Sequence, residues 1–357
     1  MFGSGPEHIM KNQIIKIISI IAAIPVILGI LVYLLTAGAS VPETVEQDLS
    51  LPHVTINNIT FHAETFGDPG NPVVIVVHGG PGDDYKSLLS LKKLSDEYFV
   101  VFYDQRGTGL SPRVGADELT FDLTVSDLDL VVDHHSQGEK VNLVGHSFGA
   151  MVVSPYIGKF SEKVDHAVLS EPGFLTQETA MMYMGYFQSK TSNPPLSYRI
   201  HKFMSWLQSL HIDGPDEQAR ADYLRERLSV SADGRSIQSE RYCNGEYATK
   251  GAKHWRGSSL ADKSIQDLSG PSGKSEWVSI GPDGIPDFNF VKGVEDFPND
   301  VLFIASECNI VFGERIQRIH MKSFPNAKLA VIDGAGHDLF AGKPDETIKV
   351  IREYLKE

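Results

Sequence analysis

The chain of 357 residues contains only two cysteines, Cys243 and Cys308. Two cysteines cannot form a disulfide framework, and their positions show no metal-ligand spacing, so we predict no metal site and no cofactor. A single bridge between them is compatible with an exported domain, and the sequence leaves their redox state open. Read alone, Cys308 is typical of a small buried residue.

Basic residues are in the minority, with 32 Lys and Arg against 46 Asp and Glu and a net charge of −14 at pH 7. This excess of negative charge argues against a nucleic-acid partner and against strong attraction to anionic lipid. Internal repeats and low-complexity tracts are also absent, which excludes a solenoid. The hydrophobic share of 41% is enough for one large domain with an insertion.

Charge is missing altogether from one N-terminal segment. Nineteen uncharged residues form the run Ile17–Leu35, a length that matches a helix spanning a bilayer. Lys11 and Lys16 precede the run and acidic residues follow it, which places the N-terminus in the cytoplasm and the rest outside. A cleaved signal peptide is the alternative, because the Ala-Gly-Ala sequence ending at Ala39 fits a cleavage site.

The remaining chain alternates between apolar runs typical of buried strands and segments with helical periodicity. The alternation stops after about residue 171 and returns at Val301, and the stretch between has helical segments at 198–210 and 217–228. This pattern predicts an α/β fold with a mostly parallel central sheet, helices on both faces and an inserted helical cap. Residues 1–10 resemble a tag scar or an alternative start and are excluded from the fold prediction. The predicted boundaries are 1–16 for a cytoplasmic N-terminus, 17–36 for the transmembrane helix, 37–51 for a linker, 52–171 and 298–357 for the two parts of the core, and 172–297 for the cap.

The most informative motif is Gly145-His146-Ser147-Phe148-Gly149, a G-x-S-x-G sequence between the apolar run 141–144 and a helix-like stretch. A serine hydroxyl is a weak nucleophile, so it has to be exposed on a tight strand-to-helix turn where a base can reach it. Glycines two positions before and after remove side chains that would clash there. The context therefore predicts a nucleophile elbow with Ser147 at its tip.

Two further loops follow predicted strands. The sequence His78-Gly79-Gly80-Pro81-Gly82 comes after the run 73–77, and a glycine-rich turn there leaves backbone N–H groups to face a developing oxyanion. His337 lies on a glycine-rich loop after the run 329–332, which suits an imidazole base. The order of serine, then acid, then histidine along the chain is the one that an α/β-hydrolase requires.

The acid is less clear, because Asn309 occupies the place where an aspartate is expected after the strand 301–304. Asn309 could orient the imidazole without charge, and Glu307 could replace it through a shifted turn. Glu171 is the third candidate, since it follows the strand after the elbow, where some α/β-hydrolases place their acid. We rank Glu171 first, Asn309 second and Glu307 third.

Taken together, the motifs resemble the proline iminopeptidase (prolyl aminopeptidase) branch of the α/β-hydrolases. The resemblance covers residues 50–357 and depends on H-G-G-P-G at 78–82, D-Q-R-G-T-G-L-S at 104–111, the elbow at 145–149 and Gly336-His337. The combination of the first two motifs is specific to this branch and its near relatives, whereas G-x-S-x-G alone is not.

The resemblance implies roles for individual residues. It makes Ser147 the nucleophile and His337 the base, with an oxyanion hole formed by the N–H of Phe148 and an N–H of Gly79 or Gly80. It also implies that Asp104 and Arg106 are paired charges that brace their loop. In the family, cap glutamates bind the free α-amine of the substrate, and the candidates here are Glu178 and Glu246.

The predicted function is therefore that of a membrane-tethered serine hydrolase, an aminopeptidase that releases N-terminal proline or a similar residue from short peptides. An esterase or another small-molecule hydrolase is the alternative within the enzyme class. A non-catalytic binding protein of the same fold is the third hypothesis, and only Asn309 motivates it. The expected partners are a small peptide or small-molecule substrate and a membrane, with the catalytic domain outside the cytoplasm or secreted after cleavage.

Overall fold

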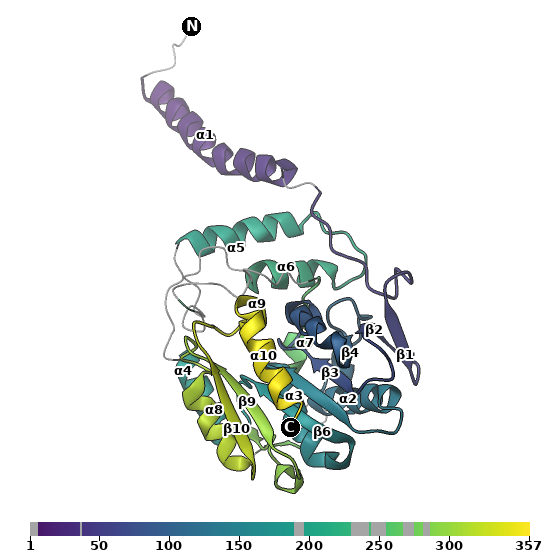
Figure 1. Cartoon of the computed structure of the whole chain (residues 1–357). Coiled ribbons are helices and arrows are strands. Elements are labelled where there is room, and N and C mark those ends of the chain that lie inside the picture. Colours follow the sequence, from purple (N-terminus) through teal and green to yellow (C-terminus); the bar gives the residue numbers. More distant parts are fainter. Residues whose placement is uncertain are drawn as a thin grey trace.

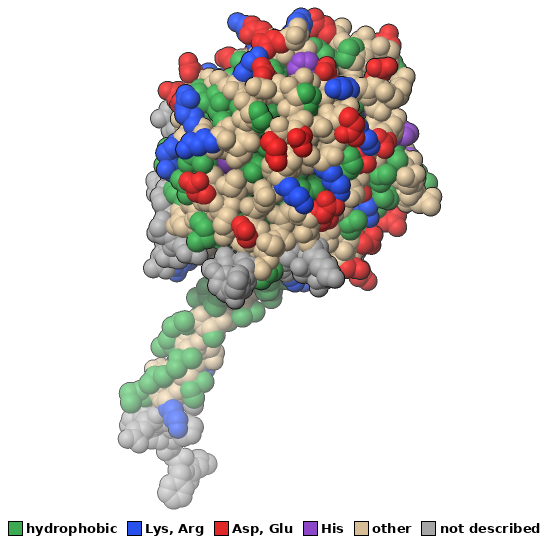
Figure 2. Space-filling model, turned by 90° about the horizontal axis from the view of Figure 1, so that it is seen from below, with side chains coloured by type: hydrophobic (Ala, Val, Ile, Leu, Met, Phe, Trp, Pro, Cys, Tyr) green, Lys and Arg blue, Asp and Glu red, His purple; other side chains and the backbone are tan. Residues whose placement is uncertain are grey.

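A computed structural model describes residues 6–35, 38–188, 196–229, 243, 255–266, 275–280 and 286–357 (Figure 1). The first described element is the single long helix α1 (Pro6–Leu35), which projects from the rest of the molecule. It begins at Pro6, inside the segment 1–10 that the fold prediction left out. The stretch Gln13–Leu35 is long and apolar enough to cross a membrane, and none of it is buried. Figure 2 shows mostly hydrophobic side chains along α1, in contrast to the mixed charges on the domain.

The centre of the domain is an eight-stranded sheet in the order β1-β2-β4-β3-β5-β6-β9-β10. The pairs β1–β2 and β2–β4 are antiparallel, and every pair from β4 to β10 is parallel, so the predicted mostly parallel sheet is confirmed. The bounds are β1 (His53–Ile56), β2 (Ile59–Phe66), β3 (Val73–Val77), β4 (Phe99–Tyr103), β5 (Val141–His146), β6 (Val164–Ser170), β9 (Val301–Ser306) and β10 (Ala327–Ile332).

Both faces of the sheet are covered, as the continuous apolar runs of the central strands predict. Along β3, Val73, Ile75 and Val77 pack into one buried cluster, and Val74 and Val76 pack into another on the opposite face. The first cluster includes α2 (Phe121–His135) and α3 (Phe148–Lys159). The second includes the 3₁₀ segment η1 (Tyr85–Asp96), α9 (Leu339–Gly342) and α10 (Pro344–Tyr354). The remaining core helices are α8 (Glu314–His320) and the short turns η2 (Ala116–Glu118), η3 (Ser161–Lys163), η6 (Val294–Asp296) and η7 (Met321–Ser323).

Between β6 and β9 lie four helices and one pair of short strands in the described part of the chain. Helices α5 and α6 fit the helical segments expected at 198–210 and 217–228. The antiparallel pair β7–β8 was not expected in a helical cap. The ends of this segment also join the core, because Leu175, Phe288 and Phe290 belong to the same buried cluster as α2 and α3. The bounds are α4 (Gln177–Gln188), α5 (Leu196–Ser209), α6 (Ala219–Ser229), α7 (Ser259–Gln266), β7 (Val278–Ile280) and β8 (Pro286–Phe288).

Candidate active site

Ser147 lies on a sharp turn between the last residue of β5 and the first residue of α3. Its φ of 54° and ψ of −119° are unusual for a residue with a side chain, and such strain is typical of a nucleophile elbow. The two flanking glycines make the turn possible. A Cβ at Gly149 would lie 2.0 Å from the carbonyl oxygen of Val77, and one at Gly145 would lie 2.7 Å from the carbonyl oxygen of Gly149.

Three side chains from separate strand ends meet at this turn. The Nε2 atom of His337 lies 3.1 Å from Ser147 Oγ, and its Nδ1 atom lies 2.7 Å from Glu171 Oε2. His337 and Glu171 are both buried, with 2% and 0% exposure. One imidazole nitrogen thus faces the hydroxyl and the other faces a carboxylate, which is the geometry of a nucleophile, a base and an orienting acid.

Glu171 is held by donors from the neighbouring strand as well as by the histidine. Its Oε1 atom accepts hydrogen bonds from the backbone N–H of Ser306 at 2.7 Å and from the hydroxyl of Ser306 at 2.5 Å. Burial raises the pKa of Glu171, and the hydrogen bonds from Ser306 and Asn309 act in the opposite direction by stabilising its charged form. The φ of 45° at Glu171 shows that this backbone is also strained.

Asn309 does not replace the acid, although it lies beside it. Its Oδ1 atom accepts hydrogen bonds from the N–H groups of Val311 and Phe312, both at 3.0 Å, which fixes the orientation of the amide. The Nδ2 group therefore points at Glu171 Oε2 and donates to it at 2.7 Å, whereas it lies 3.4 Å from His337 Nδ1. Asn309, at the position where the acid was expected, thus donates a hydrogen bond to the carboxylate of Glu171, which follows the adjacent strand.

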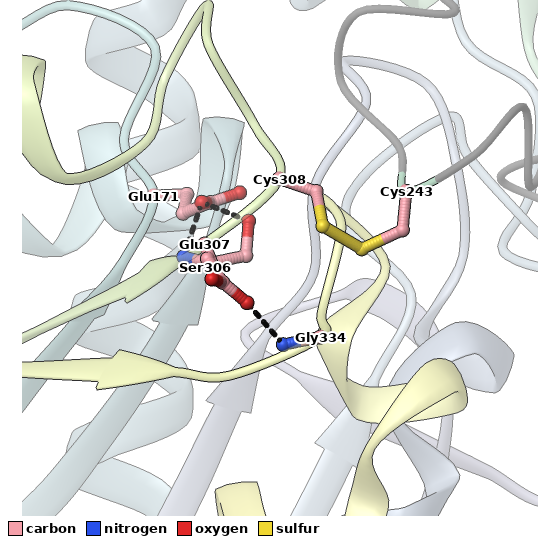
Figure 3. Close-up of a disulfide and its surroundings, with 6 residues drawn as sticks. All are labelled: Glu171, Cys243, Ser306, Glu307, Cys308 and Gly334. Atoms are coloured by element: carbon pink, nitrogen blue, oxygen red, sulfur yellow. Dashed lines mark hydrogen bonds between the residues drawn. A yellow bond between two sulfur atoms is a disulfide. The ribbon is translucent and has the colours of Figure 1, made fainter.

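Glu307, the third candidate, binds a backbone group of the loop that follows β10. It is exposed, and its Oε2 atom accepts a hydrogen bond of 2.8 Å from the N–H of Gly334 (Figure 3). Gly334 belongs to the loop between β10 and His337, so Glu307 braces the backbone that leads to His337. The proposal that Glu307 replaces the acid is wrong because its carboxylate is committed to this contact.

The glycine-rich loop after β3 lies against the elbow. A Cβ at Gly79 would come within 2.9 Å of Ser147 Cβ, so only glycine allows the backbone this close to the hydroxyl. Phe148 is the first residue of α3, and the N–H groups of a first helical turn have no partner within their helix. The structure therefore brings Gly79 and Phe148 together around Ser147, and Gly80 follows with a φ of +124°.

The motif at 104–111 forms hydrogen bonds with the glycine-rich loop at 78–82. The ring of His78 accepts the backbone N–H of Gln105 at Nε2, at 3.0 Å, and the side-chain amide of Gln105 donates to the carbonyl of His78 at 2.7 Å. Both residues are buried. The sequence beginning at Asp104 therefore acts on the site indirectly, by fixing the loop that carries Gly79.

The expected pairing of Asp104 with Arg106 is wrong. The buried carboxylate of Asp104 contacts His62 Nδ1 at 2.7 Å and accepts from two backbone N–H groups, those of Tyr85 and Leu110. Arg106 instead binds Asp127 on α2 through two hydrogen bonds of 2.8 and 2.6 Å. Each charge braces the loop, but with a different partner.

One residue that packs against this arrangement, His146, was not among the predicted site residues. His146 is the second residue of the elbow motif, and its ring centroid lies 4.8 Å from that of His337. Its Nδ1 atom lies 3.2 Å from Ser170 Oγ, and its ring also contacts Phe340. The His146 ring thus packs against the ring of His337. Its place inside G-x-S-x-G was the available signal.

Of the two glutamates proposed for the α-amine, only Glu178 lies among the described residues. Glu178 is exposed on the first turn of α4, so its charge is solvated as a surface carboxylate would be. Glu246 lies outside the described residues. Cys243 and Cys308 form a disulfide, and Cys308 is half-buried, so its interpretation as a small buried residue was wrong. The bridge ties the residue before Asn309 to the segment between β6 and β9 (Figure 3).

The sheet order, the strained serine turn and the Ser-His-Glu arrangement define an α/β-hydrolase fold. The chain belongs to this family, because a family model described as "alpha/beta hydrolase fold" matches residues 72–344.

The individual proteins that the chain resembles share limited sequence identity with it. A proline iminopeptidase of Heyndrickxia coagulans is 34% identical over 125 residues, which are 33% of this chain and 41% of that relative. The proline iminopeptidase PfmaB of Pestalotiopsis fici is 23% identical over 85% of this chain and 99% of its own length. The crystal structure of a proline iminopeptidase of Mycobacterium smegmatis matches with a TM-score of 0.55 and 17% identity, over 85% of this chain and 97% of that one. The last likeness shows the shared fold.

Proposed function

We propose that the protein is a serine hydrolase that works through an acyl-enzyme. Ser147 is the nucleophile, His337 is the general base and Glu171 is the acid that orients the imidazole. The observation that carries the proposal is the pair of contacts on His337, 3.1 Å to Ser147 Oγ and 2.7 Å to Glu171 Oε2. Both are within the reach that proton transfer and orientation need.

In the proposed reaction, Ser147 Oγ attacks the carbonyl carbon of the substrate while its proton passes to His337 Nε2. The negative charge on the carbonyl oxygen is stabilised by the N–H of Phe148 and an N–H of the loop at Gly79 and Gly80. His337 then gives the proton to the leaving group, and the acyl-enzyme forms. Water, deprotonated by the same nitrogen, releases the acid and restores the serine. Glu171 keeps the imidazole in the required tautomer and stabilises its positive charge.

For the substrate, we propose a short peptide with N-terminal proline or a similar residue. The sequence motifs and the named relatives support this proposal. One observation favours a small acyl ester instead. Glu178, the one described candidate for binding an α-amine, is exposed on α4. An ester needs no such carboxylate, and the serine, the imidazole and the oxyanion hole serve both chemistries.

The test combines covalent labelling with a comparison of substrates. A fluorophosphonate probe should label the wild-type protein at Ser147 and leave Ser147→Ala unlabelled. Turnover of a proline arylamide is then measured against turnover of a short acyl ester. Ester turnover with no arylamide cleavage would exclude the peptidase. Absence of labelling in the folded wild-type protein would favour the non-catalytic binding protein.

We further propose that α1 anchors the catalytic domain on the outer side of a membrane. The length and exposure of Gln13–Leu35 support the anchor, and the disulfide supports an oxidising compartment. The alternative is secretion after cleavage near Ala39. Intact-mass measurement and carbonate extraction distinguish the two outcomes. An anchored chain keeps residues 1–39 and stays in the membrane pellet, whereas a cleaved chain begins near residue 40 and is released.

A further inference from the structure

Helix α5 has one face that is fully engaged with the domain. Ser205 and Ser209, four positions apart and therefore on the same side of the helix, are both buried. The helix is attached to α6, where Gln208 Oε1 accepts a hydrogen bond of 3.0 Å from the hydroxyl of Tyr223. The His201 ring also contacts the carbonyl of Arg227 at 2.8 Å. These contacts fix the rotation of α5 about its own axis.

The opposite face of α5 is apolar, and apart from the buried Leu207 its large residues are exposed. Phe203 and Trp206 have 55% and 46% of their surface exposed, and their rings stack with centroids 6.0 Å apart. Arg199 and Lys202 are exposed on the same side of the helix. Large apolar residues at such exposure cost free energy in water and mark an interaction surface when they gather on one helix. The exposed apolar residues of this face, with the residue that follows the helix, are Leu196, Ile200, Phe203, Trp206 and Leu210.

Helix α5 lies beside the end of α1, where the proposed anchor joins the domain (Figure 1). The ring of Tyr33, near the end of α1, stacks on the ring of His211, just after α5, with centroids 3.7 Å apart. The carbonyl of Tyr33 also contacts His211 Nε2. Since 23 residues of helix at about 1.5 Å each span about 35 Å, an anchor that crosses the bilayer puts Tyr33 at its outer boundary. α5 is then held at the same depth.

We propose that the exposed face of α5 docks on the outer leaflet of the membrane in which α1 is embedded. Its composition fits this occupant, because aromatic and aliphatic side chains enter the headgroup boundary while Arg199 and Lys202 stay at the phosphates. The apolar residues provide the attraction, since the chain as a whole is acidic. Two elements therefore orient the domain on the bilayer: α1 crosses it, and α5 lies on its outer surface. This inference rests on the proposed membrane anchor.

Fluorescence quenching in single-copy nanodiscs tests the docking. The full chain is placed, one copy per disc, in phosphatidylcholine with and without brominated acyl chains. The chain has three tryptophans, and the other two are held inside the domain, Trp277 buried and Trp255 packed against Tyr85. The difference between the wild-type chain and Trp206→Phe therefore isolates Trp206. We expect brominated lipid to lower the Trp206 emission about twofold, as for a ring buried at the acyl boundary.

A double variant, Phe203→Glu with Leu210→Glu, should abolish that quenching, and the control Ile280→Glu on β7 should preserve it. Fluorophosphonate labelling verifies that each variant is folded. Trp206 that is unquenched in the wild-type chain, or equally quenched in the double variant, overturns the docking. If Trp206 is not quenched by lipid in single-copy discs but becomes shielded from solvent when two copies of the chain are crosslinked, the exposed face of α5 binds a second copy instead. Loss of the chain from the discs would instead contradict the anchor, so the two failures are distinguishable.

Discussion

The loops after the adjacent strands β6 and β9 each carry a polar side chain near the imidazole of His337, but only one of the two side chains is a carboxylate. The end of β6 carries Glu171, whose Oε2 atom lies 2.7 Å from His337 Nδ1. The end of β9 carries Asn309, whose amide lies 3.4 Å from the same nitrogen. The strands are parallel neighbours, with Ser170 opposite Ile304, so both loops emerge at the same edge of the sheet.

The difference between these positions is one of reach, because the carboxylate of Glu171 contacts the imidazole more closely than the amide of Asn309 does. At the β9 end, the amide oxygen of Asn309 is committed to two backbone N–H groups, and its nitrogen supplies a donor to Glu171. A second carboxylate there would lie against the first in a buried site, where like charges disfavour ionisation of both. An amide at β9 is therefore the complement of a carboxylate at β6.

The largest effect is expected from removing the charge at the β6 end. Glu171→Gln should lower kcat/KM by about 10³- to 10⁴-fold, because an uncharged side chain no longer fixes the tautomer or stabilises the imidazolium. The measurement is turnover of whichever substrate the wild-type chain cleaves, with thermal unfolding as the control for folding. Near-wild-type turnover of folded Glu171→Gln would show that the β9 end supplies the orienting group after all.

Moving the charge from one strand end to the other sharpens the comparison. The double variant Glu171→Gln with Asn309→Asp should recover about 10- to 100-fold of the lost turnover, since a carboxylate at 309 can approach His337 Nδ1 and the new amide can donate to it. The single change Asn309→Asp should slow the enzyme, because it places two buried carboxylates together. Faster turnover of that single variant would contradict this account.

Much of this arrangement could be predicted from the sequence, for local reasons. The apolar run Val73–Val77 is buried on both faces, so its composition alone indicates a central parallel strand. The elbow at 145–149 and the loop at His337 follow such strands directly, and each is typical of its role. Glu171 could be ranked first because it also comes immediately after a strand.

The remainder depends on contacts between distant segments. That Asn309 donates to Glu171 follows from the register of β6 on β9 across 138 positions, which no local pattern encodes. The partners of Asp104 and Arg106 are equally non-local, since His62 and Asp127 lie on separate elements. The exposed state of Glu178 depends on how α4 packs, and helical periodicity could not show that.

Deleting the donor at the β9 end should have a smaller effect than deleting the acid. Asn309→Ala should lower kcat/KM by about 10- to 100-fold, the range expected for a lost hydrogen bond to a charged group. The sign of the pH effect follows from the same bond. Asn309 stabilises ionised Glu171, so its loss raises the pKa of that carboxyl further above its ordinary value. The acid limb of the pH profile of kcat/KM should therefore move to higher pH.

A second variant distinguishes stabilisation of the Glu171 charge by Asn309 from a purely structural role of Asn309 in its loop. Asn309→Ser keeps a small polar side chain but not the amide that reaches Glu171, so its acid limb should also lie higher than in the wild-type chain. An unchanged acid limb in both variants, with turnover reduced, would mean that Asn309 only orders the loop through Val311 and Phe312.

The smallest effect concerns the side chain of Gln317 on α8, which binds the loops after both β6 and β9. Gln317 donates to the carbonyls of Pro172 and Phe312, one on each loop, and its Oε1 atom lies 3.2 Å from the ring of His320. Burial lowers the pKa of His320 to about 3 from 6.5. Between these values the unfolded chain binds a proton that the folded chain does not, so the free energy of unfolding falls as the pH falls from 6.5 towards 3.

Replacing this histidine by an apolar residue should remove that dependence. Urea unfolding at pH 7.5 and pH 5 should show the wild-type chain losing roughly 1–2 kcal/mol more than His320→Leu over this interval. Equal losses in the wild-type chain and His320→Leu would mean that His320 becomes protonated within the fold. His320 would then donate to Gln317 Oε1 in its charged form, and its protonation would leave in place the two hydrogen bonds from Gln317 to the carbonyls of Pro172 and Phe312.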